Sequence, residues 1–186
     1  MSAIAAKGLD VTVDDMAEAA MVSRRTVFRH FATHTAVLVA AIAEILRVYD
    51  ANMPAPPAPG TDVDAWLSDS AVAIHELNRR VLGRAFWDAH VERPGIAPEV
   101  TAAIGLLRHA RDRYADDLAT GAWQALGAQG TPPHWVVDAF ILQLSGFATN
   151  AMDGHSTEQA GRVSALVLSA VLAAALAGPG KAERRD

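Results

Sequence analysis

Residues 11–31 read VTVDDMAEAAMVSRRTVFRHF, and this stretch decides the fold. Thr12 and Ser23 each have the features of a helix N-cap, because a hydroxyl side chain can accept a hydrogen bond from the first turn that follows. Only Met21, Val22 and the cap residue Ser23 separate the two expected helices, 12–20 and 24–31. Two short helices joined by so tight a turn have the proportions of a helix-turn-helix.

A third helix follows directly. Thr33 is placed to cap it, and apolar residues recur at helical spacing from His34 to Asp50. We therefore expect residues 1–50 to form a three-helix unit.

The charges support a nucleic-acid surface on this unit, although the whole chain has a net charge of −5. No acidic residue lies between Glu18 and Glu44, and that window holds Arg24, Arg25 and Arg29. Arginine suits bidentate contacts with guanine and with phosphates. A few clustered arginines are often only a solvated surface patch, but the tight turn, the two caps and the missing acids together favour DNA.

The rest of the chain is also expected to be helical. Four prolines between Met53 and Gly60 interrupt the helical pattern, because proline lacks the N–H that a helix needs. We expect a linker at 51–61, a helical bundle at 62–178 and a flexible tail at 179–186. The predicted helices of the bundle are 63–81, 82–91, 98–126, 132–152 and 157–176. The fold class is therefore all-α.

The last two predicted helices are apolar nearly all round, which indicates burial against a core or a second subunit. A chain of this size has little interior in which to hide both, so we expect a homodimer. The predicted interface residues are Trp135, Leu142, Val163, Leu166, Val167 and Val171.

The bundle also has enough large side chains to line an apolar ligand pocket with a few orienting polar groups. Each aromatic taken singly is as well explained by the core. The predicted lining residues are Trp66, Phe86, Trp87, His90, Trp123, Phe140, Gln143 and Phe147.

Several classes of site are absent from the sequence. The chain has no cysteine, which excludes disulfides and thiolate metal sites. His30 and His34 have a metal-ligand spacing, but Thr33 caps a new helix between them, so we expect no metal site and no cofactor. The sequence has no H-E-x-x-H motif, no Glu-x-x-His pair, no phosphate-binding glycine loop and no G-x-S-x-G motif. The start lacks a signal peptide, and the longest apolar run, 163–177, is short for a membrane span, so a cytoplasmic protein is expected.

The stretch 11–31 resembles the DNA-binding signature of the TetR/AcrR family of transcriptional regulators. The family pattern reads T-V-x-x-I-A-x-x-A-G-V-S-x-x-T-L-Y-x-H-F. The resemblance implies that Val22, Val27 and Phe31 are core positions, and that the helix from Arg24 enters the major groove. We expect Arg24 and Arg25 to read bases and Arg29 to hold the backbone. The implied DNA-binding residues are Thr12, Ser23, Arg24, Arg25, Thr26, Phe28, Arg29, His30, Thr33 and His34.

The chain departs from the family pattern at several positions. Met21 replaces the usual turn glycine and could have to adopt a left-handed conformation. Phe28 lacks the tyrosine hydroxyl, and His34 stands for a lysine that would bind phosphate at any pH. Only about two helical turns, Ala3 to Gly8, precede the motif, where the family has a full bracing helix. These changes predict weaker or more pH-sensitive operator binding rather than its loss.

The resemblance implies a ligand-responsive homodimeric regulator, most simply a repressor, that binds double-stranded DNA at an inverted-repeat operator and is released by a small apolar effector. Two alternatives remain open. One is a helical ligand-binding dimer with a vestigial DNA-binding unit, and the other is a helical-bundle enzyme.

Overall fold

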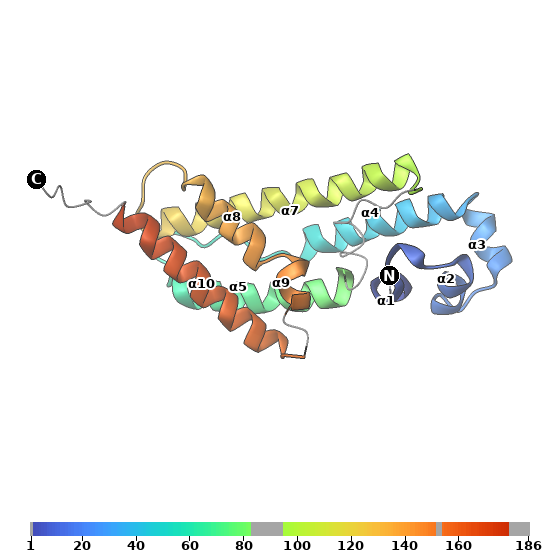
Figure 1. Ribbon diagram of the computed structural model, residues 1–186, viewed down its shortest axis with the longest axis horizontal. Coiled ribbons are helices and arrows are strands. Elements are labelled where there is room, and N and C mark those ends of the chain that lie inside the picture. The colour runs from blue at the N-terminus through green and yellow to red at the C-terminus, as the bar shows by residue number, and fades with distance from the viewer. Residues whose placement is uncertain (1, 83–94, 152–153, 179–186) are drawn as a thin grey trace, which may run out of the picture.

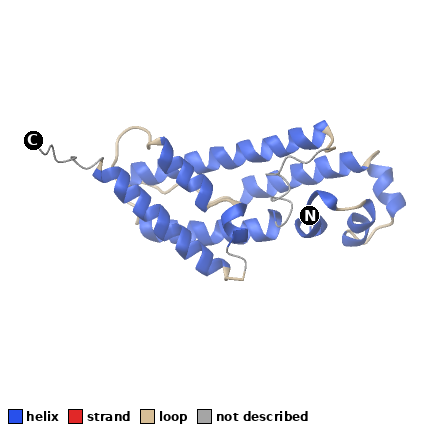
Figure 2. Cartoon of the chain, viewed as in Figure 1, coloured by secondary structure: helices blue, strands red, loops and turns tan. Residues whose placement is uncertain are grey.

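The computed structural model describes residues 2–82, 95–151 and 154–178, and these form helices joined by loops, with no strand among them (Figures 1 and 2). The elements are α1 (Ser2–Lys7), η1 (Gly8–Asp10), α2 (Val13–Ala19), α3 (Arg24–His30), α4 (His34–Asn52), α5 (Val63–Leu77), η2 (Asn78–Leu82), α7 (Pro98–Ala125), α8 (His134–Gln143), α9 (Gly146–Ala151) and α10 (Thr157–Ala177). The all-α class is confirmed.

The N-terminal unit forms as the caps predict. Thr12, Ser23 and Thr33 each accept a hydrogen bond from a backbone N–H in the first turn of the helix they precede. The unit has a small core of its own, in which Val13 and Ala17 of α2 pack with Val27 of α3 and Val37 of α4. This core sets the angle between α2 and α3.

Helix α4 connects this unit to the bundle. Its buried residues Leu38, Ile42 and Ile45 share a second core with Leu77 at the end of α5 and with Val100 of α7. In Figure 1, α4 and α7 run side by side along the molecule. Helix α4 therefore contributes to both cores, with Val37 in the small N-terminal core and Leu38, Ile42 and Ile45 in the second one.

Part of the proline segment that was predicted as a linker packs against α7 and α5. A Cβ added to Gly121 of α7 would lie only 2.5 Å from the Cβ of Pro56 and 2.9 Å from the Cδ of Pro57. Trp66 of α5 donates its ring N–H to the carbonyl of Ala55 at 3.1 Å. The segment thus fixes the position of α4 against the bundle.

The bundle core contains Phe140, Leu118, Ile74, Leu168 and Leu172, all nearly inaccessible to solvent. They come from α8, α7, α5 and α10, so one core holds the four helices together.

Helices α5 and α10 approach most closely where Gly161 faces Val72. A Cβ at Gly161 would lie 2.5 Å from Val72 Cγ2 and 2.6 Å from its backbone nitrogen. Glycine is needed here for close helix contact, and not for an unusual backbone conformation.

Two predicted helices are wrong in their extent. The predicted helix 132–152 is broken into α8 and α9 at Leu144 and Ser145, because Ser145 starts a new helix by accepting a hydrogen bond from the Ala148 N–H at 3.2 Å. The predicted helix 63–81 ends as an α-helix at Leu77 and continues as the π-helix η2. The predicted helix 82–91 lies almost wholly outside the described residues.

By length and composition, α10 could cross a membrane, and the bent pair α3 and α4 passes the same test together. A partly buried core helix of a soluble protein passes it too. Helix α10 packs on α5 and α8. Leu168 and Leu172 on its inner face are buried, whereas Leu166 is 71% exposed.

Candidate DNA-binding surface

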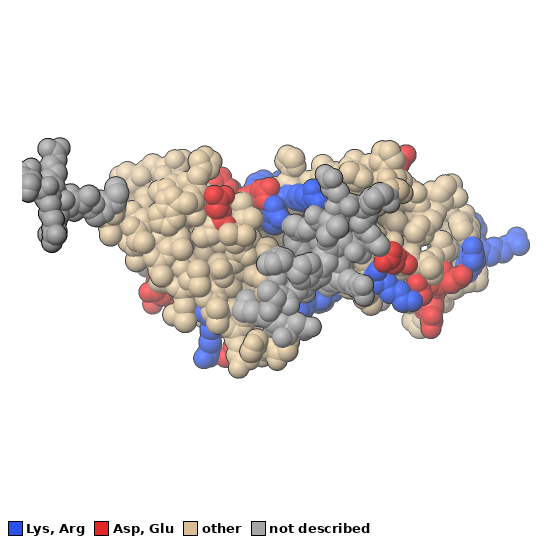
Figure 3. Space-filling view, in the orientation of Figure 1, with Lys and Arg blue, Asp and Glu red and all other residues tan. Residues whose placement is uncertain are grey.

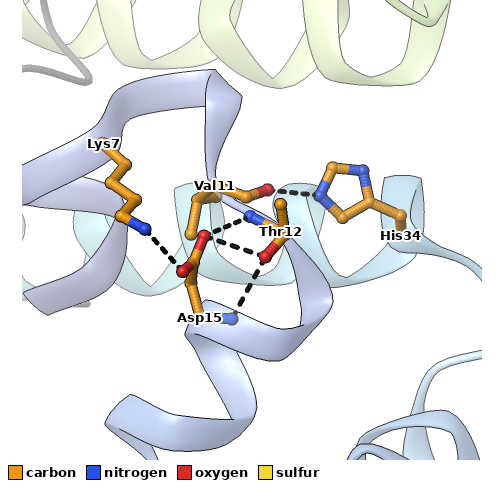
Figure 4. A network of polar contacts seen from close by, with 5 residues as sticks. All are labelled: Lys7, Val11, Thr12, Asp15 and His34. Carbon is orange, nitrogen blue, oxygen red and sulfur yellow. Dashed lines mark hydrogen bonds and ion pairs between the residues drawn. The ribbon is translucent and has the colours of Figure 1, made fainter.

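The start of α2 is held by a dense local network (Figure 4). The Asp15 N–H donates to Thr12 Oγ1 at 3.2 Å, and the Thr12 N–H donates to Asp15 Oδ2 at 2.9 Å, which together form a capping box. Lys7 at the end of α1 donates to the other oxygen of Asp15 at 2.5 Å. The hydrogen bond from Lys7, together with those from Thr12, lowers the pKa of Asp15 to about 2. The short α1 is thereby attached to α2.

His34 has a structural partner that its sequence position did not reveal. Its Nε2 donates to the carbonyl of Val11 at 2.7 Å, across the start of α2 (Figure 4). That nitrogen is therefore occupied, which leaves Nδ1 of the ring for the phosphate contact predicted for His34. The bond instead fixes the first residue of α4 to the residue before the Thr12 cap.

The turn between α2 and α3 has the geometry expected for a glycine. The Val22 N–H donates to the Ala17 carbonyl at 2.9 Å, and the Met21 N–H donates to the Glu18 carbonyl at 2.9 Å. This pair of bonds is a Schellman motif, whose middle residue takes a left-handed conformation. Met21 does so with a φ of 54°. The left-handed conformation expected for Met21 is therefore confirmed.

Helix α3 presents its basic side chains to solvent. Ser23 caps it by accepting from the Thr26 N–H at 3.1 Å, and Val27 faces the core. Arg25 and Arg29 are exposed, and neither makes an ion pair or hydrogen bond with another described residue. In Figure 3, basic side chains project from the end of the molecule at which α3 lies in Figure 1.

Arg24 has different surroundings. Its Nη1 lies 3.0 Å from Asp14 Oδ2, and its guanidinium carbon stands 5.5 Å from the centre of the Phe28 ring. The ion pair is exposed on both sides, so it is easily exchanged for a contact with a phosphate or base. The stacking on Phe28 holds the guanidinium at the α3 surface.

Residues 1–41 match the family model described as "Bacterial regulatory proteins, tetR family". The match covers α1 to the first half of α4, which is the unit that carries the capped helix-turn-helix. The N-terminal unit is thus similar to that of tetR-family DNA-binding transcription regulators. No curated protein matches, and no solved structure matches.

Members of the tetR family are regulators, generally not enzymes, and are soluble DNA-binding proteins. Among the residues that the structure describes, no group of three or more acidic or histidine side chains could hold a metal ion.

Val22 does not occupy the buried core position that the tetR pattern implies. Val22 is 40% exposed, whereas Val27 is buried and Phe31 is partly buried. Val22 lies beside an open apolar groove of about 420 Å³, whose other walls include Ile4 of α1 and Met16 of α2.

The remaining predicted DNA-binding residues are mostly exposed. Thr12, Ser23 and Thr33 are exposed at their helix starts, and His30 is exposed at the end of α3. Thr26 is partly buried, and its hydroxyl oxygen lies 2.9 Å from that of Ser23.

The predicted ligand-pocket residues are only partly brought together. Trp123 and Phe140 pack in the bundle core, and Trp66 packs partly against it. Phe140 borders a cavity of about 20 Å³ beside Tyr49 and Tyr114, which has room for one water molecule. Phe86, Trp87 and His90 lie outside the described residues, the Phe147 side chain is not described, and Gln143 is partly buried.

The predicted dimer-interface residues form exposed apolar surface on α8 and α10. Leu142 is 63% exposed, and Trp135, Val163, Leu166 and Val167 are exposed as well. Val171 differs, because it is partly buried against the bundle core. Figure 3 shows that the face over these helices carries few charged side chains.

Two partners of the surface are not predicted by the sequence: Asp14, which pairs with Arg24, and the Val11 carbonyl, which accepts from His34. Neither has a signal in the local sequence, because each pair joins residues ten or more positions apart.

Proposed function

We propose that the protein is a homodimeric repressor that binds an inverted-repeat operator and is released by a small apolar ligand. The observation that carries the proposal is the exposed arginine surface of α3, in which Arg25 and Arg29 have no partner among the described residues. An uncommitted guanidinium is free to make bidentate contacts with guanine, and Arg24 can leave Asp14 to do the same.

The charge distribution supports specific rather than general binding to DNA. Three arginines lie in a window without acids, while residues 51–186 carry 11 basic and 15 acidic residues. An acidic body limits attraction to phosphate along any sequence, so the affinity depends on the contacts of α3.

The exposed apolar faces of α8 and α10 support a dimer. Five large side chains, Trp135, Leu142, Val163, Leu166 and Val167, stand exposed on two adjacent helices. Monomers rarely leave so much contiguous apolar surface in water. A symmetric dimer through this surface would carry two α3 helices, and two half-sites on one DNA face lie about 34–36 Å apart.

The first experiment tests DNA recognition. Random duplex DNA is selected with the wild-type protein, and the preferred sequence is titrated at several salt concentrations. Arg25→Ala is expected to weaken binding to that sequence by about 1–3 kcal/mol and to relax its preference. Arg47→Ala removes the same charge from the exposed side of α4, where Arg47 pairs with Glu44, and serves as the control.

No selected sequence, or equal losses for the Arg25 and Arg47 variants, would refute the operator proposal. The first outcome would favour a ligand-binding dimer with a vestigial DNA-binding unit.

The second experiment tests the dimer by light scattering. Leu166→Glu places a charge on the exposed face of α10 and is expected to give a monomer. Leu106→Glu changes an equally exposed leucine on α7 and is the control. A wild-type monomer at micromolar concentration, or dissociation by the Leu106 variant alone, would contradict the proposed interface.

The effector is proposed to bind in the bundle, at residues 62–178, and to favour a dimer in which the two α3 helices have the wrong separation. The proposed lining includes Trp66 and Gln143 together with the residues outside the described part. We propose a cytoplasmic location and no enzymatic activity or cofactor. Titration of the purified dimer with apolar and aromatic compounds, followed by loss of binding to the selected DNA, tests the effector response.

A further inference from the structure

The bundle contains a buried polar cluster that DNA recognition does not use. Its five side chains come from five different elements, and each is at most 5% exposed. They are Tyr49 of α4, His75 of α5, Asn78 of η2, Thr149 of α9 and Ser164 of α10. Every buried side-chain nitrogen and oxygen in the described part of the chain has a hydrogen-bond partner. A fully paired network of this kind fixes one arrangement of the helices that contribute to it.

The cluster begins at the end of α4. The Tyr49 hydroxyl donates to Asn78 Oδ1. The Asn78 amide nitrogen donates to Thr149 Oγ1 at 3.0 Å and to the carbonyl of Leu144 at 3.1 Å. The carbonyl of Leu144 fixes this orientation, because a flipped amide would place two acceptors against each other.

The second half of the cluster passes through His75. Its Nδ1 lies 2.7 Å from Thr149 Oγ1, and its Nε2 lies 2.9 Å from Ser164 Oγ. Ser164 in turn donates to the carbonyl of Gln143 at 3.1 Å. Burial lowers the pKa of His75 to about 4, so the ring carries one proton at neutral pH.

The single ring proton is compatible with two arrangements of the hydrogen bonds. When Ser164 donates to the Gln143 carbonyl, Nε2 donates to Ser164 and Nδ1 accepts from Thr149. When Thr149 donates to the Ser145 carbonyl, 3.2 Å from its Oγ1, Nδ1 donates to Thr149 and Nε2 accepts from Ser164. Both arrangements link Tyr49 on α4 through His75 to Ser164 on α10.

The acceptors at the end of this chain lie at the break between α8 and α9. In an unbroken helix, the carbonyls of Gln143 and Leu144 would accept from the backbone four residues later. Here they accept from Ser164 of α10 and from Asn78 of η2 instead. The sequence 132–152 has the pattern of one continuous helix, so the buried side chains stabilise the break against a local alternative.

We propose that this cluster is a coupling device, in which the α8–α9 break and the position of α4 can change only together. It rests on the proposed function, because α4 carries the DNA-reading helix at its other end, while α8 and α10 carry the proposed dimer surface. If α4 or the α8–α9 break moves alone, buried polar groups lose their hydrogen-bond partners, and this costs free energy. The two ends therefore share one preferred arrangement.

The first test compares two serines of α10 by amide hydrogen exchange of the whole chain. Ser164→Ala removes the link from His75 to Gln143. Ser169→Ala is the matched control, because Ser169 bonds Asp64 of α5 at the surface, 2.6 Å away. We expect Ser164→Ala to raise exchange in residues 45–52 of α4 by about tenfold, and Ser169→Ala to leave those amides unchanged. Equal effects, or a Ser164 effect confined to α8, α9 and α10, would overturn the proposal.

A second pair of variants guards against simple loss of folding. Thr149→Val keeps the shape of the side chain but removes the hydroxyl between Asn78 and His75, whereas Thr149→Ser keeps the hydroxyl. Thr149→Val is expected to raise α4 exchange as Ser164→Ala does, and Thr149→Ser to restore the wild-type rate. If both variants behave alike, packing rather than hydrogen bonding holds α4, and the proposal is wrong.

The third measurement connects the cluster to the DNA-binding surface. The chain has no cysteine, so Ala32→Cys at the exposed corner between α3 and α4 gives one spin-label site per subunit. We expect the label-to-label distance in the dimer to shift or broaden with Ser164→Ala and to stay unchanged with Ser169→Ala. An unchanged distance in both variants would refute the link to the DNA-binding surface. A monomeric wild type would refute the proposed function instead, and the exchange experiment would still test the cluster.

Discussion

Replacing Met21 by glycine should stabilise the protein, because Met21 occupies a position whose backbone suits glycine. Met21 follows the last residues of α2 with a φ of 54°, and the Schellman hydrogen bonds on either side leave it no other conformation. Its side chain is 93% exposed, so its removal takes almost no apolar surface out of the core.

The size of the effect follows from two opposed contributions. The left-handed conformation costs an L-residue roughly 1–2 kcal/mol, which glycine avoids. Glycine makes the unfolded chain more flexible, which costs about 0.4–1 kcal/mol. The expected net gain for Met21→Gly is about 1 kcal/mol.

Met21→Ala separates backbone strain from the loss of the methionine side chain. Alanine keeps the Cβ and thus the strain, so its stability should stay within about 0.5 kcal/mol of the wild type. Urea unfolding of the full chain, followed by helical circular dichroism, measures both variants. In thermal unfolding, a gain of 1 kcal/mol corresponds to about 2–4 °C for a chain of this size. If Met21→Gly is no more stable than Met21→Ala, the turn is not strained.

Other parts of the structure give further predictions. Gly161→Ala should destabilise the bundle by about 1–3 kcal/mol in urea unfolding, because its Cβ would overlap α5. Gly105→Ala, with nothing within 4 Å of the added Cβ, should stabilise by about 0.5–1 kcal/mol, and loss of stability in both variants would contradict this account. Asp14→Asn should raise affinity for the selected DNA by up to about fivefold by freeing Arg24, and weaker binding would show that the ion pair helps to position Arg24. Because the pKa of His75 is about 4 when folded and near 6.5 when unfolded, unfolding takes up a proton in acid. The free energy of unfolding should therefore fall as the pH drops from 6.5 towards 4. If it falls equally steeply with pH in the His75→Gln variant, the proton uptake belongs to another group.

The N-terminal unit could be predicted from the sequence almost completely. Thr12, Ser23 and Thr33 cap the three helices where their hydroxyls predict, and Met21 adopts the strained turn. These features depend on hydrogen bonds and backbone preferences within four or five residues, so the local sequence is sufficient to specify them.

The local sequence is therefore sufficient to predict an all-α chain with a capped helix-turn-helix and an arginine-rich second helix. Only the tertiary structure decided the partner of Arg24, the occupation of His34 and the break after α8. In each case the deciding partner lies ten or more residues away: Asp14, the Val11 carbonyl, and Ser164 with its bond to the Gln143 carbonyl. Local preference favours a continuous helix across residues 132–152, and the break is stable because packing brings polar side chains from two other elements to the freed carbonyls.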